Sequence, residues 1–232
     1  MYDNLNLGNS IFKGLNDKHG LVICGYEYGW SKSDQAEYER REAEGLNYPD
    51  KNEVTFTFAN KELFLGEHYW KIPYDNRIAK WFELWNHPLN RDGLGDDFTK
   101  SIMQTNISNT QNNAVEDYEE IARGVDDFVE FLKVLSPSVI LFMGRKNSDF
   151  INRTDNLPKI ESVLGKSKPR DIQRAETDGR KFDVVFQDFE NCRTVTLPHP
   201  SNYQYGLSDE YIASFKPQLD DILSEYKVKR GF

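Results

Sequence analysis

Apolar and polar residues follow one another in short blocks along the chain, and two apolar blocks end in glycine. Residues 21–25 (LVICG) and 139–144 (VILFMG) are apolar throughout, which is typical of strands buried on both faces of a sheet. Strand composition predicts further strands over 54–58, 101–107, 182–189 and 193–197.

Apolar residues at helical spacing lie between several of these strands. They predict helices over 75–85, 114–135 and 208–226, the last with an interruption near Pro217. Asp75 is expected to be the N-cap of the first of these helices. The polar segment 31–44 is rich in helix formers and predicts either a solvated helix or an ordered lid.

Strands that alternate with helices predict an α/β fold with a mostly parallel sheet covered on both faces. A length of 232 residues fits one such domain, and two small domains remain an alternative. Ligands of these sheets bind beyond the carboxyl ends of the strands. Four strand ends carry polar or glycine-rich sequence and should converge on one rim: 25–29, 106–109, 144–147 and 199–202.

The composition narrows the range of partners and compartments. The chain has 29 Lys and Arg against 38 Asp and Glu, a net charge of −9, which argues against a strong general nucleic-acid binder but not against a local basic groove. No apolar run approaches about 20 residues, and the N-terminus lacks a secretory signal, so we expect a cytoplasmic protein without a membrane span. Two cysteines are too few for a disulfide framework, a zinc cluster or a four-cysteine iron–sulfur site.

Two side chains beside strand ends have the chemistry of catalytic groups. Glu27 follows the first strand by two residues, where a partly desolvated carboxylate can act as a base, orient a water or stabilise a cationic transition state. The alternative is a cap for the next helix. His199 lies between two prolines, which fix its backbone, so a neutral imidazole can donate to an oxyanion and a charged one can bind phosphate. The alternative is a loop histidine bonded to backbone.

Other candidates suit nucleotide binding. Asn106 ends a strand and can read a base edge, although it can also be a turn residue. The backbone amides near Ser201 can bind phosphate. Basic residues in 166–181 are interleaved with acidic ones, so a solvated face is favoured over a phosphate site. Four aromatic residues can stack on a base or pack in the core: Tyr28, Trp30, Phe56 and Phe58.

Taken together, these segments resemble motifs of the uracil-DNA glycosylase superfamily. The sequence GYEYG at 25–29 is similar to its first motif, which varies around GQDPY, GEAPG, GMNPG and GINPG. The sequence HPSNYQYG at 199–206 resembles its late HPSP-like motif. TNISN at 105–109 falls where the family has its base-reading Asn, and 136–148 resembles the strand before the late motif. The resemblance spans roughly residues 21–226.

The resemblance implies a single domain over 1–232, a three-layer αβα sandwich around a four-stranded parallel sheet, and hydrolysis of the N-glycosidic bond of a flipped base. It implies a monomer that acts on DNA with water, without cofactor or metal, in the cytoplasm or on a bacterial nucleoid. The implied catalytic residues are Glu27, which orients water, and His199, which stabilises the leaving base. The implied base contacts are Asn106, Tyr28, Phe56 and Gly29, and the implied DNA-backbone and wedge residues are Ser201, Asn202 and Tyr203.

The chain departs from the family pattern in ways that affect function. Tyr26 and Tyr28 replace small, polar or proline residues, and Asn202 replaces the second proline of HPSP. Gly29 stands where the most uracil-specific members carry Tyr, which leaves room for a substituent on the base and predicts activity beyond uracil. The alternatives are a non-catalytic binding module, whose site would be filled by Tyr26 or Tyr28, and a hydrolase of free nucleosides.

Overall fold

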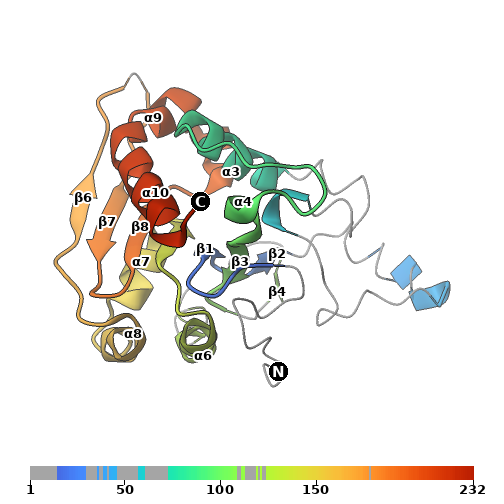
Figure 1. The fold of residues 1–232 in the computed structure, drawn as a ribbon, viewed down its shortest axis with the longest axis horizontal. Coiled ribbons are helices and arrows are strands. Elements are labelled where there is room, and N and C mark those ends of the chain that lie inside the picture. The colour runs from blue at the N-terminus through green and yellow to red at the C-terminus, as the bar shows by residue number, and fades with distance from the viewer. Residues whose placement is uncertain are drawn as a thin grey trace.

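The computed structural model describes residues 15–29, 36, 39–40, 42–45, 57–60, 73–108, 111–112, 119, 121, 124–177 and 179–232. Its centre is a six-stranded mixed sheet. Helices cover both faces of this sheet (Figure 1). The expected α/β class is therefore confirmed.

Four adjacent strands of the sheet are parallel, in the order β3-β1-β5-β8. They are β1 (Leu21–Gly25), β3 (Ile102–Asn106), β5 (Val139–Met143) and β8 (Arg193–Leu197). Two antiparallel strands extend the β8 edge: β7 (Val184–Asp188) and β6 (Asp171–Gln173). The sheet thus has six strands where the resemblance implied four, because the chain turns back twice beside β8. A separate parallel pair joins β2 (Tyr28–Gly29) to β4 (Gln111–Asn112).

Successive residues of β1 supply the cores on opposite faces of the sheet. Leu21 and Ile23 belong to one buried cluster, and Val22 and Cys24 to the other. The first cluster lies under α3 (Pro73–Leu84), α4 (Asp97–Lys100), α9 (Asp209–Ala213) and α10 (Lys216–Arg230). The second lies under α6 (Val125–Leu135), α7 (Lys146–Ile151) and α8 (Leu157–Leu164). These three layers explain why β1 and β5 are apolar at every position (Figure 1).

Several element boundaries differ from the sequence prediction for local reasons. Asp75 lies in the first turn of α3, which begins at Pro73, so it is not the N-cap. The predicted helix over 114–135 is interrupted by a turn at Gly124, after helical residues 119 and 121. A Cβ at position 124 would lie 2.9 Å from the Cα of Ser108, so this glycine allows the two segments to touch.

The polar segment 155–180 contains two elements that its composition did not reveal, α8 and the edge strand β6. The predicted interruption near Pro217 is confirmed, because α9 ends at Ala213 and α10 begins at Lys216. The predicted strand over 54–58 lies largely outside the described residues, and Phe58 begins the short helix η1 (Phe58–Asn60). Of 31–44, only 36, 39–40 and 42–44 are described, and they are exposed.

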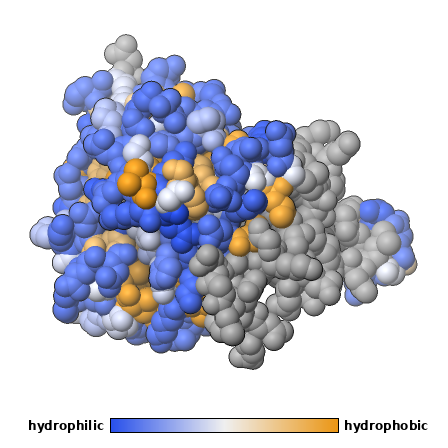
Figure 2. Space-filling model, viewed as in Figure 1, coloured by the Kyte–Doolittle hydropathy of each residue, from blue (hydrophilic) through white to orange (hydrophobic). Residues whose placement is uncertain are grey.

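Among the described residues, the exposed large hydrophobic side chains are Ile172, Tyr205 and Val228. Figure 2 shows only scattered hydrophobic residues on the face that it presents. Among the described helices, none is both long and apolar enough to cross a membrane.

Candidate functional site

The carboxyl ends of the four parallel strands meet at one edge of the sheet. Gly25 is in register with Asn106, and Met143 with Leu197. The backbone N–H of Gly144 continues this pairing and donates to the carbonyl oxygen of Leu197 at 2.8 Å. The loops that follow these four strands therefore start from a common rim, as the sequence predicted.

His199 is held at this rim in a defined protonation state. It caps the short helix η3 (Pro200–Tyr205), and its Nδ1 accepts the backbone N–H of Ser201 at 3.2 Å and lies 2.7 Å from the Ser201 hydroxyl oxygen. Because Nδ1 accepts a backbone N–H, the proton of the neutral ring resides on Nε2. Burial lowers the pKa of His199 to about 4, so the ring is neutral at physiological pH.

Two tyrosine rings lie against the imidazole of His199. Tyr26 is parallel to it, with ring centroids 5.8 Å apart and an interplanar angle of 4°. Tyr74, from the first turn of α3, is tilted by 50° with centroids 5.3 Å apart. Within the described part of the chain, Nε2 of His199 has no hydrogen-bond partner. The imidazole thus keeps one N–H donor that no described residue uses.

The position of Tyr26 depends on Gly144. The Tyr26 hydroxyl accepts the backbone N–H of Lys146 at 3.1 Å, and the ring packs edge-on against Phe150. A Cβ at position 144 would lie 2.3 Å from the Tyr26 ring, and Gly144 has φ +123°. The glycine that closes β5 therefore serves two purposes, a left-handed backbone and room for an aromatic side chain.

The side chain of Asn106 lies over the backbone of Gly25. A Cβ at position 25 would lie 2.3 Å from Oδ1 of Asn106 and 3.4 Å from the hydroxyl oxygen of Tyr74. The Asn106 side chain is half-buried and makes no hydrogen bond to any described residue. Asn106 thus lacks the bond to nearby backbone that is typical of a turn asparagine, among the described residues, and its role in reading a base remains a prediction.

Glu27 directly follows Tyr26 in the sequence. The residue is half-buried, and its Oε1 is buried. The backbone of Tyr28 and Gly29 forms β2, while their side-chain environments and all of Phe56 lie outside the described residues. The roles of Tyr28, Gly29 and Phe56 in base binding remain predictions.

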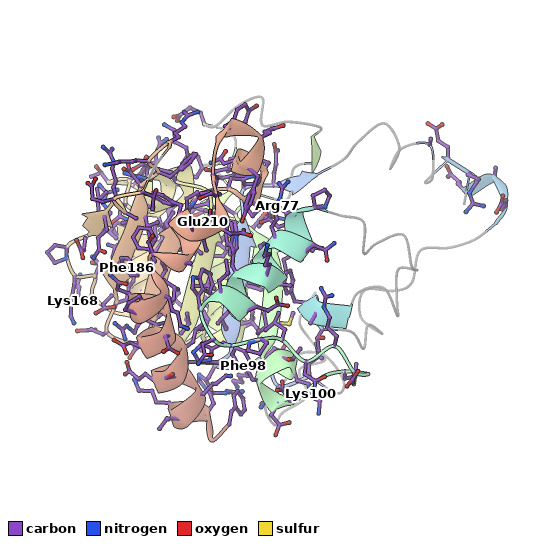
Figure 3. The ribbon with its side chains drawn as sticks, turned by 90° about the horizontal axis from the view of Figure 1, so that it is seen from above. Arg77, Phe98, Lys100, Lys168, Phe186 and Glu210 are labelled. Carbon is purple, nitrogen blue, oxygen red and sulfur yellow. The ribbon has the colours of Figure 1, made fainter. Side chains whose placement is uncertain are left out.

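The loop that carries His199 is anchored to α3, which packs beside η3 and α9 and carries Arg77 (Figure 3). Arg77 donates to the carbonyl oxygen of Pro200 at 2.8 Å, and its guanidinium lies 4.5 Å from the ring centroid of Tyr203. The Tyr203 hydroxyl accepts from Nε1 of Trp81 at 3.2 Å and donates to Asp209. Tyr203 would have to give up these contacts to serve as a wedge.

Two backbone amides of this loop, predicted from the sequence as phosphate donors, instead make hydrogen bonds within the loop. The N–H of Ser201 donates to Nδ1 of His199, and the N–H of Asn202 donates to the carbonyl oxygen of His199 at 2.8 Å. A phosphate contact by Ser201 or Asn202 would therefore need other atoms. Tyr205 is 57% exposed and is the accessible aromatic ring of this loop.

The basic cluster of residues 166–181 is mostly paired with carboxylates. Each of five cations lies within ion-pair distance of an acidic side chain: Lys166, Lys168, Arg170, Arg174 and Lys181. Arg180 instead lies over the Phe182 ring, 5.5 Å from its centroid. This pairing supports the prediction of a solvated charged face.

The described ranges contain two cysteines and no cluster of metal ligands. No group there of three or more His, Cys, Asp or Glu could hold a metal ion. Cys24 and Cys192 are buried as free thiols, and burial raises the pKa of each well above its ordinary value.

The half-buried His199 predicts a pH-dependent stability. Its pKa is about 4 in the fold against 6.5 when unfolded, so the unfolded chain binds more protons between these values. The contribution of the neutral His199 to the free energy of unfolding is fully present above pH 6.5. About 3 kcal/mol of this contribution is lost as the pH falls toward 4. Denaturant unfolding from pH 7 to 4 should show a steeper loss for the wild type than for His199→Gln. Equal slopes would contradict this.

Sequence reasoning missed Tyr74 and the packing role of Gly144. Tyr74 follows Pro73 at a helix start, and nothing in that pattern signals that its hydroxyl reaches the strand rim. Gly144 carried a weak signal, because a glycine directly after a buried strand often marks a left-handed turn.

Comparison of the chain with protein-family models found no matching family, and comparison with curated proteins found no relative. The case for a function therefore depends on the chemistry of the rim.

Proposed function

We propose that this protein is a DNA-base glycosylase that hydrolyses the N-glycosidic bond of uracil or a related modified base, and that it is a divergent member of the uracil-DNA glycosylase superfamily. The observation that carries the proposal is the neutral His199, whose Nδ1 is occupied and whose Nε2–H points to no described partner. Such a preorganised donor suits the anion that develops on a leaving base.

In the proposed reaction, the bond between the sugar C1′ and the base nitrogen breaks, and the electron pair leaves with the base. The Nε2–H of His199 donates to the base oxygen that gains negative charge. A water oxygen then bonds to the oxocarbenium-like C1′ and loses a proton to solvent, with Glu27 as the anion that orients it. The base takes up a proton from solvent after release.

Two further features support the proposal. The four adjacent parallel strands correspond to the sheet that the resemblance implies, with β6 and β7 as additions at one edge. Asn106, an implied base contact, and His199, the residue implied to stabilise the leaving base, both lie around Tyr74 at one rim. Both retain hydrogen-bonding groups that no described residue uses.

A second candidate is a non-catalytic module on the same fold that binds a nucleotide, a nucleic acid or a protein. The Tyr26 ring favours it, because the ring is stacked on His199 and held by its hydrogen bond from Lys146. A ring fixed beside the imidazole narrows the space for a flipped base.

A strand-cleavage assay after alkali tests the first candidate. Single- and double-stranded oligonucleotides should carry uracil, mismatched thymine, hypoxanthine or 5-hydroxymethyluracil. We expect cleavage at uracil and at one 5-substituted uracil or more, because Gly29 presents no side chain to a substituent at that position. Cleavage at uracil alone would contradict the predicted room around the base.

The controls are Glu27→Ala and His199→Ala. Unchanged cleavage in both variants would remove the proposed mechanism. Binding of these oligonucleotides without cleavage of any of them would favour the binding module.

A further inference from the structure

The hydroxyl group of Tyr74 differs from those of the other packed tyrosines. Four described tyrosines use their hydroxyls in hydrogen bonds: Tyr26 with Lys146, Tyr203 with Asp209, Tyr211 with Phe182 and Tyr226 with Ser101. The Tyr74 hydroxyl has no such partner in the described part of the chain. Tyr74 is half-buried rather than enclosed, so this hydroxyl is available to a ligand.

Tyr74 lies between the two side chains that are proposed to contact the base. Its ring packs against His199, with centroids 5.3 Å apart. Its hydroxyl oxygen and Oδ1 of Asn106 both approach the same point above Gly25, at 3.4 Å and 2.3 Å. A ligand that bonds to both Asn106 and His199 would therefore lie close to Tyr74.

The protonation state of the Tyr74 hydroxyl suits hydrogen bonding to a ligand rather than abstraction of a proton from it. Burial, followed by the negative charge of Asp75, raises the pKa of Tyr74 well above its ordinary value of 10.0. The group thus stays protonated and can both donate and accept a hydrogen bond. The Asn106 amide has the same versatility, so the pair can match a carbonyl or an amino substituent.

We propose that Tyr74 is a specificity-determining residue of this site, whose hydroxyl group binds the polar edge of the base together with the amide of Asn106. The inference rests on the proposed glycosylase function and extends it, because it assigns part of the base recognition to a helix start outside the two sequence motifs. Since a phenylalanine keeps the ring against His199, Tyr74→Phe removes only this recognition group.

The test compares the wild type, Tyr74→Phe and the matched control Tyr226→Phe. Tyr226 lies near the amino ends of the strands, where its hydroxyl donates to Oγ of Ser101 at 2.7 Å. Single-turnover excision is measured on the four base-modified oligonucleotides. Binding is measured with an oligonucleotide whose target nucleotide carries a 2′-fluorine, which slows cleavage of the glycosidic bond.

Tyr74→Phe should weaken binding and slow excision about 10-fold for the preferred base and change the ranking of the bases. Its melting temperature should match the wild type, because no internal hydrogen bond is lost. Tyr226→Phe should show the reverse, with a lower melting temperature and wild-type excision.

Excision within twofold of the wild type for every base in Tyr74→Phe would overturn the inference and leave the glycosylase proposal intact. A wild-type protein that excises none of the bases would instead defeat the glycosylase proposal, and this inference with it.

Discussion

Replacing His199 with alanine should lower the rate of base excision about 10²- to 10³-fold, the usual effect of removing one preorganised donor to a developing anion. The structure gives the reason for a large effect. The ring is neutral because burial lowers its pKa to about 4, and Ser201 fixes its tautomer so that Nε2 carries the proton. The hydrogen bond from a neutral donor becomes stronger as negative charge develops on the base. Loss of this donor should therefore lower mainly the rate of the chemical step.

Two further variants make the His199 experiment specific. His199→Gln keeps a neutral N–H donor on a side chain of similar reach, so it should retain more activity than His199→Ala. His87→Gln is the matched control, since the buried His87 bonds instead to Asp220, at 2.9 Å, and does not belong to the rim. Single-turnover rates at pH 7.5 check the order. If His199→Ala and His87→Gln lowered the rate of base excision equally, the effect of His199→Ala would be explained by reduced stability of the fold.

Replacing Gly144 with alanine should destabilise the fold by about 3 kcal/mol, because the substitution combines backbone strain with overpacking. Gly144 has φ +123°, and its Cβ would lie 2.3 Å from the Tyr26 ring. The ring cannot simply move away, since it is stacked on His199 and bonded to the N–H of Lys146. The damage should therefore extend to the candidate site.

The variant Gly179→Ala separates backbone strain from overpacking, the two effects that Gly144→Ala combines. Gly179 also has a positive φ, +107°, but its Cβ would meet no described atom within 4 Å. It should cost only the backbone strain, about 1 kcal/mol. Denaturant unfolding measures both values, and a Tyr26→Ala/Gly144→Ala double-mutant cycle should show that the two changes are not additive. Equal costs at 144 and 179 would refute the steric contact with Tyr26.

Much of the fold could be predicted from the sequence where burial leaves a local pattern. β1 and β5 lie between two helical layers, so every position is apolar and the strands are visible as continuous runs. β6 is exposed at the edge of the sheet, so its three residues carry no apolar pattern. β7 runs antiparallel to β8, and this direction is set by the pairing of the two strands. The residues of β7 carry no local pattern that reveals it.

The candidate site shows the same division. The positions of Glu27, Asn106 and His199 at strand ends could be predicted from the sequence, and a parallel α/β sheet brings such ends to one rim. The groups that surround the imidazole, and the ring nitrogen that carries its proton, depend on the folded arrangement of distant segments. Tyr26, Tyr74 and Gly144 come from three separate segments, and contacts between distant segments are set by packing rather than by any local pattern.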